Sequence, residues 1–415
     1  MKPQFTPKTY LIHATLFLLS IFTTLLVGTE LTTGKIWAGW GLVEKQYLLQ
    51  WTDLAKGVSY SLGFLLFLTF HEFGHFFAAL YHRVRTTLPF YIPFYIPLPG
   101  ILNIGSFGAV IVLKQIPDSS RKFFDIGIAG PLAGFVVSVL LLVYGFSHLP
   151  PMESYVLGIH PEYQETFGGA PSDEQMKAWL LSDPNRQAYV IGTNFLFEFL
   201  KNVIPSDPSQ VPGQFEIMHY PLLFVGYITL FFTALNLLPI GQLDGGHIIY
   251  GMFGRKTAGY ISRIAIVGLL LAGGTGYVEI RDISPGKVLV MGVYALFLVY
   301  IFSQLLGKNN WKEIAVFFVI TFLIQMIIKL NFPSIPPNFI WIFYSFLVLR
   351  FVKPDHPAAY HEHRVNLPRQ ILGWVAILIF VLCFTPSPIQ VVGGEADMLD
   401  GMLNDYLSFV GSSRP

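Results

Sequence analysis

Long apolar runs are the feature that most constrains this chain, because about 20 consecutive apolar residues in a helix are enough to cross a lipid bilayer. Nine such runs follow one another: 10–28, 58–81, 126–147, 218–240, 258–278, 288–307, 314–328, 330–349 and 367–386. The seventh is short and the eighth contains three prolines, so these two could instead form a re-entrant pair. The pattern predicts an all-α polytopic integral membrane protein with about nine transmembrane helices.

Composition supports this fold class. Of the 415 residues, 53% are hydrophobic and 12% are charged, whereas soluble domains average about 25% charged residues. The net charge of +1 offers no basic field that would attract nucleic acid. Cys383 is the single cysteine, which excludes a disulfide within the chain and a cysteine-based zinc site. A water-soluble enzyme is therefore a poor explanation of the sequence.

Basic residues gather in alternate loops, as the cytoplasmic side of a membrane protein requires. Loop 82–125 carries five basic and two acidic residues, whereas loop 148–217 carries three basic and nine acidic ones. The tail 387–415 is also acidic. An orientation with the N-terminus inside and the C-terminus outside puts each basic cluster in the cytoplasm. Loop 148–217 and the tail are then predicted to be extracytoplasmic.

Loop 148–217 is the one sizeable polar region between the runs. Within it, residues 187–203 predict an amphipathic helix at the membrane–water boundary. The chain shows no internal repeat, so the inverted-repeat pattern of many transporters is not evident.

Three ionisable residues share the second apolar run, where such groups cost roughly 2.5–3.5 kcal/mol each and tend to be functional. His71 and His75 are four residues apart, so both rings project from one face of a helix and can hold one zinc ion. Glu72 can reach a water molecule rather than the metal, as the general base does in the H-E-x-x-H arrangement of zinc peptidases.

A catalytic zinc site needs a third protein ligand and an open position for water. Asp244 follows the fourth run in the sequence NLLPIGQLDGGH and is the leading candidate by elimination. Pro239, Gly241, Gly245 and Gly246 are expected to break the helix there, which is tolerated at membrane depth where the backbone lines a cavity. The orientation puts Asp244 and the histidine pair in the cytoplasmic half of the membrane at comparable depth.

The remaining histidines are expected to have supporting or solvated positions. His247 is close to Asp244 and is interpreted as a supporting residue rather than a ligand. The sequence His361-Glu362-His363 falls in a cytoplasmic loop and is expected to be solvated. His13 and His219 lie near the ends of apolar runs and have no partner pattern.

HEFGH in one run and NLLPIGQLDGGH in a later one together resemble the site-2 protease family of intramembrane zinc metalloproteases, in its bacterial and chloroplast-type branch. GSFGAVI at 105–111 and AGPLAGF at 129–135 agree with the resemblance. It implies hydrolysis of peptide bonds in or near the transmembrane segments of membrane-protein substrates, with one zinc ion per chain. It also implies a bacterial inner membrane, with the active site toward the cytoplasm.

Residue by residue, the resemblance implies that His71, His75 and Asp244 are zinc ligands and that Glu72 is catalytic. It further implies that Asn236 lies near the scissile carbonyl and can stabilise the oxyanion. Many relatives carry a PDZ domain in the place of loop 148–217. Because this loop has no clear series of alternating strands, a PDZ domain is not expected here.

The segment 97–114 is apolar but too rich in glycine and proline to form a spanning helix. It is expected to form a membrane-associated β-hairpin or loop beside the zinc, with 105–111 as its substrate-binding edge. Gly105, Phe107, Gly108 and Ala109 are the predicted substrate-binding residues. The simpler alternative is a structural loop on the cytoplasmic face.

Four regions follow from these assignments. They are an N-terminal helix with an outer loop (1–57), a three-helix metalloprotease core (58–253) with the insertion 148–217, C-terminal helices (254–386) and an extracytoplasmic tail (387–415). The alternatives to a protease are a transporter or channel with a buried His/Glu/Asp relay, and a catalytically silent membrane scaffold.

Overall fold

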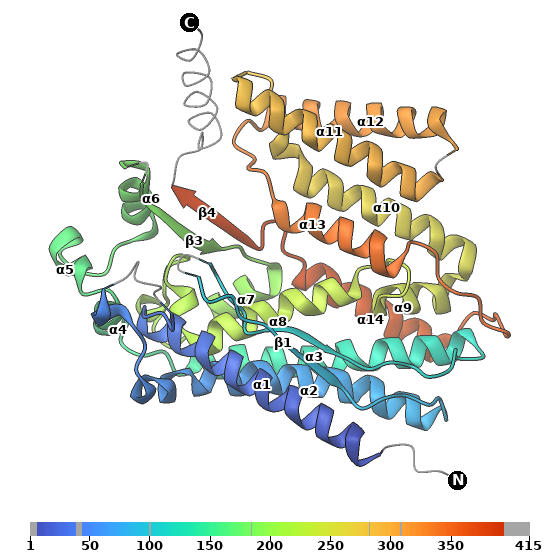
Figure 1. The fold of residues 1–415 in the computed structure, drawn as a ribbon, viewed down its shortest axis with the longest axis horizontal. Helices are drawn as coiled ribbons and strands as arrows, with labels where there is room; N and C mark the ends of the chain where they lie inside the picture. The colour runs from blue at the N-terminus through green and yellow to red at the C-terminus, as the bar shows by residue number, and fades with distance from the viewer. Residues whose placement is uncertain are drawn as a thin grey trace, which may run out of the picture.

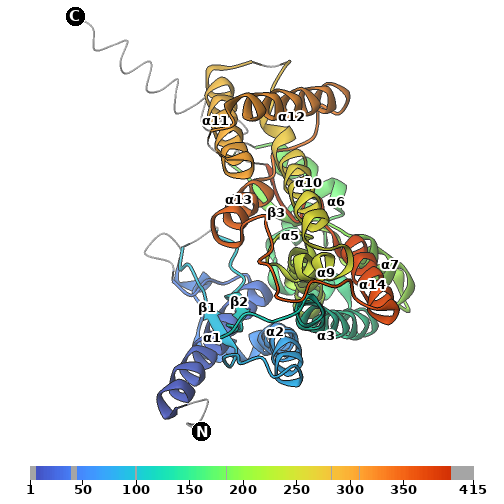
Figure 2. The ribbon, with the colours of Figure 1, turned by 90° about the vertical axis from the view of Figure 1, so that its right-hand side faces the viewer.

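The computed structural model describes residues 6–38, 44–98, 101–183, 185–281, 283–307 and 309–393, and helices dominate it (Figure 1). The principal helices are α1 (Pro7–Thr33), α2 (Val58–Tyr81), α3 (Ser120–Ser147), α8 (Pro221–Leu237), α9 (Asp244–Phe253), α10 (Arg255–Gly274), α11 (Pro285–Leu306), α12 (Trp311–Asn331), α13 (Phe339–Leu347) and α14 (Leu367–Cys383). Figure 2 shows α11 and α12 at the opposite edge of the molecule from α1 and α2.

Each of the nine predicted apolar runs overlaps one apolar helix of the described chain. Six of these helices are long and apolar enough to cross a membrane, and α8, α13 and α14 are shorter. The mostly helical, membrane-spanning fold is confirmed. Exposed apolar side chains along α11 and α12 fit this assignment, because the lipid-facing side of a spanning helix has no need of polar groups.

Helices α2, α3 and α8 pack on one another. Small residues let the backbones approach closely, as is common between helices in membranes. A Cβ atom at Gly74 would lie 2.6 Å from the backbone oxygen of Ala129, and one at Gly226 would lie 2.4 Å from the side chain of Leu142. The contact at Gly74 holds the histidine-bearing turn of α2 against α3, and the contact at Gly226 holds α8 against α3.

A short antiparallel sheet crosses beside α2. Strand β1 (Phe90–Pro93) pairs with β2 (Ser106–Val110), with Tyr91 opposite Ala109. The hairpin was predicted for 97–114, but its first strand, β1, lies earlier in the chain than this segment. Residues 99–100 of the predicted segment lie outside the described residues. Gly105 and Gly108 have φ angles of 89° and 107°, which only glycine adopts without strain.

The insertion 148–217 contains α4 (Met152–Ile159), α5 (Glu162–Phe167), α6 (Asp173–Leu181), β3 (Gln187–Ile191), α7 (Phe195–Val203) and the 3-10 turns η3 (Pro208–Gln210) and η4 (Ile217–His219). Its described part has one strand and is otherwise helical or irregular, so no PDZ domain is shown.

The predicted amphipathic helix 187–203 is wrong in its first half. Residues Gln187–Ile191 form β3, which pairs along its whole length with β4 (Ile389–Gly393), and only Phe195–Val203 is helical. Aromatic and β-branched residues favour a strand when a partner strand is available. Asn194 caps α7, because its side chain accepts a hydrogen bond from the backbone N–H of Phe197 at 2.9 Å. The tail beyond Gly393 lies outside the described residues.

Candidate metal centre

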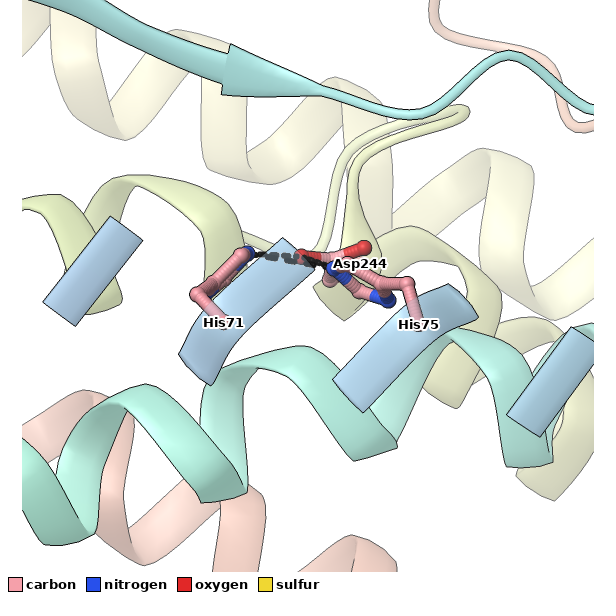
Figure 3. Close-up of side chains that lie close together, drawn as sticks. All are labelled: His71, His75 and Asp244. Atoms are coloured by element: carbon pink, nitrogen blue, oxygen red, sulfur yellow. Dashed lines mark hydrogen bonds and ion pairs between the residues drawn. The ribbon is translucent and has the colours of Figure 1, made fainter. Parts of the chain in front are cut away.

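Two histidines one turn apart on α2 point toward the same place (Figure 3). The Nε2 atoms of His71 and His75 are 3.1 Å apart, and both residues are buried. The Nδ1 atom of His75 lies 2.7 Å from the backbone oxygen of Ile126. Because a carbonyl can only accept, Nδ1 carries the proton and Nε2 presents a lone pair, as in a metal-binding histidine.

Asp244 completes a group of three, which we name the membrane cluster: His71, His75 and Asp244. Its Oδ2 atom is 3.5 Å from Nε2 of His71 and 3.3 Å from Nε2 of His75. In tetrahedral zinc sites with metal–nitrogen distances of 2.0–2.1 Å, two ligand atoms are about 3.3 Å apart. These separations therefore fit one zinc ion with a fourth position left open.

The turn between α8 and α9 brings Asp244 to the histidines. Helix α8 ends at Leu237 and α9 begins at Asp244 itself. Gly245 and Gly246, which were expected to break the helix, instead lie in the first turn of α9. A Cβ atom at Gly245 would lie 2.1 Å from the backbone oxygen of Leu237, so the tight return of the chain depends on glycine there.

A cavity of about 260 Å³ opens at the membrane cluster. Glu72, Asn236 and the end of β2 line it together with the three cluster residues. The Nδ2 atom of Asn236 is 3.3 Å from Nε2 of His71. The backbone N–H group of Ile111 lies next to the Glu72 carboxylate. The structure thus brings all five residues predicted for metal binding and catalysis to one cavity.

The four predicted substrate-binding residues have different surroundings. Among them, all within the described chain, only Ala109 lines the cavity. Phe107 is 65% exposed on the same strand. A Cβ atom at Gly105 would lie 2.7 Å from the backbone of Thr24, so this glycine packs against α1 rather than facing the site. Gly108 has open space beside it.

His247 also lines the cavity, but its ring is engaged elsewhere. Its Nδ1 atom is 2.7 Å from Nε2 of His356, and the ring of Phe123 stacks on it at 5.2 Å. These contacts fit the supporting position expected from the sequence. The loop around His361 is exposed, as predicted.

Two glycines of α3 form a cradle for the histidines, a feature that sequence reasoning missed. A Cβ atom at Gly130 would lie 2.1 Å from Nε2 of His75, and one at Gly134 would lie 3.2 Å from Nδ1 of His71. The two glycines are four residues apart, like the two histidines, so matching turns of α2 and α3 face each other. The spacing within AGPLAGF was the available signal.

Comparison with known proteins agrees with this geometry. The family model described as peptidase family M50 matches residues 59–274, which contain the whole membrane cluster. "Probable zinc metalloprotease EGY1, chloroplastic" of Arabidopsis thaliana is 31% identical over 56% of this chain, and its rice counterpart (Oryza sativa subsp. japonica) is 29% identical over 56%. "Probable zinc metalloprotease EGY2, chloroplastic" of Oryza sativa subsp. indica is 30% identical over 48% of the chain.

These matches cover 36%, 34% and 30% of the three relatives, so the chain spans about a third of their length. No solved structure matches this one. The family match extends over more than half of the chain and includes both zinc motifs. On this evidence the chain belongs to peptidase family M50.

Proposed function

We propose that this protein is an intramembrane zinc metalloprotease that hydrolyses peptide bonds in or near the transmembrane segments of membrane-protein substrates. One observation carries the proposal. Two buried histidines, an aspartate and a glutamate meet in a cavity beside α2 and α3, two helices that are long and apolar enough to span a membrane. Neither a transporter relay nor a silent scaffold requires ligand atoms at separations that fit a zinc ion.

His71, His75 and Asp244 would hold one zinc ion. A bound zinc ion would supply Lewis acidity toward the peptide carbonyl and would make water acidic enough to lose a proton near neutral pH. Glu72 takes the proton of the attacking water on its carboxylate and passes it to the leaving nitrogen. Asn236 directs its side-chain amide at the carbonyl oxygen as negative charge develops there.

Substrate is proposed to bind along β2 in extended form, because a helical peptide hides its carbonyl groups in intrahelical hydrogen bonds. The strand supports this role through its position, since Ala109, Val110 and Ile111 line the same cavity as Glu72. An open strand edge can replace the hydrogen bonds that a helix loses when it unwinds. Gly105, Phe107 and Gly108 would contribute to this edge by setting the conformation of the strand and its exposure to substrate.

The proposed topology has nine spans around the core of α2, α3 and α8, with the N-terminus and the active-site end in the cytoplasm. The pairing of β3 with β4 supports a common side of the membrane for the insertion and residues 389–393. An even number of crossings must therefore separate them, and the six apolar helices α8, α10, α11, α12, α13 and α14 meet this condition. We also propose the division into the four regions 1–57, 58–253, 254–386 and 387–415, which is consistent with this topology.

The family resemblance implied a bacterial inner membrane, but the plant relatives are named as chloroplastic, so the comparisons do not support that membrane. The multi-pass membrane location is common to both. Fractionation of cells of the source organism, followed by immunoblotting, would distinguish the two membranes.

The decisive experiment uses Glu72→Gln in the full-length protein. This change removes the base but no metal ligand, so cleavage should fall by about 10²–10⁴-fold while zinc is retained. Membrane proteins that accumulate on the variant are identified by mass spectrometry and then offered to the wild type in proteoliposomes. Glu165→Gln, at an exposed position of the insertion, is the matched control and should cleave normally.

Near-normal cleavage by Glu72→Gln would remove Glu72 from the mechanism. A purified wild-type protein without zinc and without cleavage of any captured protein would favour the transporter or scaffold instead.

A further inference from the structure

A second group of histidine and carboxylate side chains meets in the insertion. His160, Glu216 and His219, which we name the insertion cluster, bring their ligand atoms within 4.8 Å of one another. His160 follows α4, Glu216 directly precedes the turn η4, and His219 is the last residue of that turn, just past the insertion and before α8. The proposed proteolysis uses none of these three residues.

In each histidine of the insertion cluster, the Nδ1 atom contacts a hydrogen-bond acceptor outside the cluster. Nδ1 of His219 lies 2.5 Å from the backbone oxygen of Leu31, so this nitrogen carries the proton and Nε2 presents a lone pair. Nδ1 of His160 lies 2.9 Å from Oε1 of Glu162, which favours the same arrangement in that ring. The two Nε2 atoms are nevertheless only 3.1 Å apart. Either a proton or a metal ion must lie between them.

Glu216 decides between these two possibilities. The residue is 5% exposed, and its Oε2 atom is buried with no hydrogen-bond partner. A buried carboxylate oxygen without a partner is costly. A proton shared by the two rings would leave this oxygen unsatisfied, whereas a metal ion accounts for all three ligand atoms at once.

The charges around Glu216 also favour a cation. The ionisable groups that face its carboxyl are Asp173, Glu162, His160 and Tyr163, and the hydroxyl group of Tyr163 donates a hydrogen bond to this carboxyl. Two of these neighbours are carboxylates, and no lysine or arginine is among them. A divalent ion would offset the negative charge that gathers at this point of the insertion.

We propose that the insertion cluster binds a second divalent metal ion of the zinc type, through Nε2 of His160, Nε2 of His219 and the carboxylate of Glu216. Two imidazoles and one carboxylate suit zinc, whereas calcium and magnesium prefer all-oxygen sites. The total becomes two zinc ions per chain, one more than the sequence predicts.

The second ion would fasten three parts of the molecule. It joins the end of α4 to the start of α8, and the hydrogen bond from His219 to Leu31 extends the link to α1. The hydroxyl group of Tyr155 also donates to the backbone oxygen of His219 at 2.8 Å. Figure 1 shows α4 and α5 at one end of the helix bundle, where such a link fixes the insertion to the spans. The role is structural.

Metal content of the purified full-length protein tests the proposal. Wild-type protein, dialysed against buffer with trace zinc, should hold two equivalents by inductively coupled plasma mass spectrometry. His160→Ala, His219→Ala and Glu216→Gln should each hold one, and the equivalent that remains at the membrane cluster shows that the variant is folded. His148→Ala removes an exposed histidine at the end of α3 and should keep both equivalents.

A second experiment removes ligands from the membrane cluster and leaves the insertion cluster unchanged. The double variant His71→Ala/Asp244→Ala lacks the membrane ligands and should still take up one equivalent of zinc. With cobalt(II) as the probe, it should show the visible absorption of a tetrahedral site, and His160→Ala added to it should abolish that absorption.

The proposal would be overturned if the wild-type protein held one equivalent of zinc and the double variant held none. The insertion cluster would then be a pair of histidines that share a proton. The proteolysis proposal is unaffected by that result, because it depends on Glu72 and the membrane cluster. If a single insertion variant loses both equivalents through misfolding, uptake by the double variant still decides.

Discussion

The membrane cluster and the insertion cluster bring the same types of atom together in different surroundings. In both, two Nε2 atoms are 3.1 Å apart, a backbone carbonyl accepts from Nδ1 of one histidine, and a carboxylate completes the group. The membrane cluster adds a cavity lined by a fourth ionisable residue, Glu72. At the insertion cluster, the ring of Tyr163 packs on that of His160.

This difference teaches that a ligand set does not by itself make a catalyst. A structural zinc site is closed by protein groups, whereas a catalytic site keeps an open position, room for substrate and a base. The ring of Tyr163 stacks on that of His160 with a centroid distance of 4.7 Å. The membrane cluster instead borders the cavity beside β2.

The largest expected contrast comes from removing the carboxylate of each cluster. Asp244→Ala should abolish cleavage and lose the membrane zinc, because two histidines alone hold the metal weakly. Glu216→Ala should lose the other zinc and keep most of the activity. Zinc analysis and cleavage of a captured substrate measure both effects. Unchanged zinc content in Asp244→Ala would remove that residue from the site.

The glycine cradle offers the next contrast. Gly130→Ala places a methyl group 2.1 Å from Nε2 of His75, so the ring must move. A displacement of about 1 Å at a catalytic group can cost 10²-fold in rate, so cleavage should fall by about that factor. The zinc content of the membrane cluster should fall as well.

Gly268→Ala is the control for this change, since no heavy atom lies within 4 Å of a Cβ there. In a helix this substitution stabilises by roughly 0.5–1 kcal/mol. If Gly130→Ala is as active as Gly268→Ala, α2 and α3 can separate without cost. That result would contradict the close packing of these two helices.

The membrane cluster was predictable from the sequence, whereas the insertion cluster was not. His71, Glu72 and His75 form a local motif, and Asp244 stands out as an acidic residue beside an apolar run. Separation in sequence explains the difference, because His160 and His219 are 59 residues apart and only folding brings them together. The spacing of Glu216 and His219, three residues apart on one turn, was the remaining local signal.

The fold shows the same limit. Hydrophobic runs located the nine apolar helices found in the described part of the chain, because a long apolar run is visible in composition alone. Strand β3 was mistaken for helix, since its partner β4 is about 200 residues away and periodicity cannot reveal it. The first strand of the hairpin was missed for a related reason, as pairing decides which extended segment becomes a strand.

A smaller effect is expected at β2, where Gly108 and Gly168 form a matched pair. Both have positive φ angles, of 107° and 77°, and a Cβ at either would meet nothing within 4 Å. Gly108→Ala and Gly168→Ala therefore each carry backbone strain of about 1–3 kcal/mol. If β2 binds substrate, only Gly108→Ala should lower kcat/KM, by about tenfold, with both zinc ions retained.

Equal activity of the two alanine variants would return β2 to a structural role. Gly108→Pro is a harsher form of the same test, because proline fixes φ near −65° and the strand must bend.

The last prediction concerns which side of the membrane each cluster faces, and it needs substitutions with almost no effect on stability. Glu165→Cys lies in the insertion, and Tyr360→Cys lies in the loop after α13, where the tyrosine is 88% exposed. Exposed positions of this kind change stability by less than about 0.5 kcal/mol. The background carries Cys383→Ala, since Cys383 is fully buried and alanine leaves no unsatisfied hydroxyl group there.

An impermeant maleimide applied to sealed, right-side-out vesicles should label Glu165→Cys and spare Tyr360→Cys. Inverted vesicles should give the reverse. Labelling of both positions from one side would put the insertion cluster and the cytoplasmic loop together, and the nine-span topology would then be wrong. An impermeant chelator added to right-side-out vesicles extends the test, because it should remove zinc from the insertion cluster while proteolysis at the membrane cluster continues.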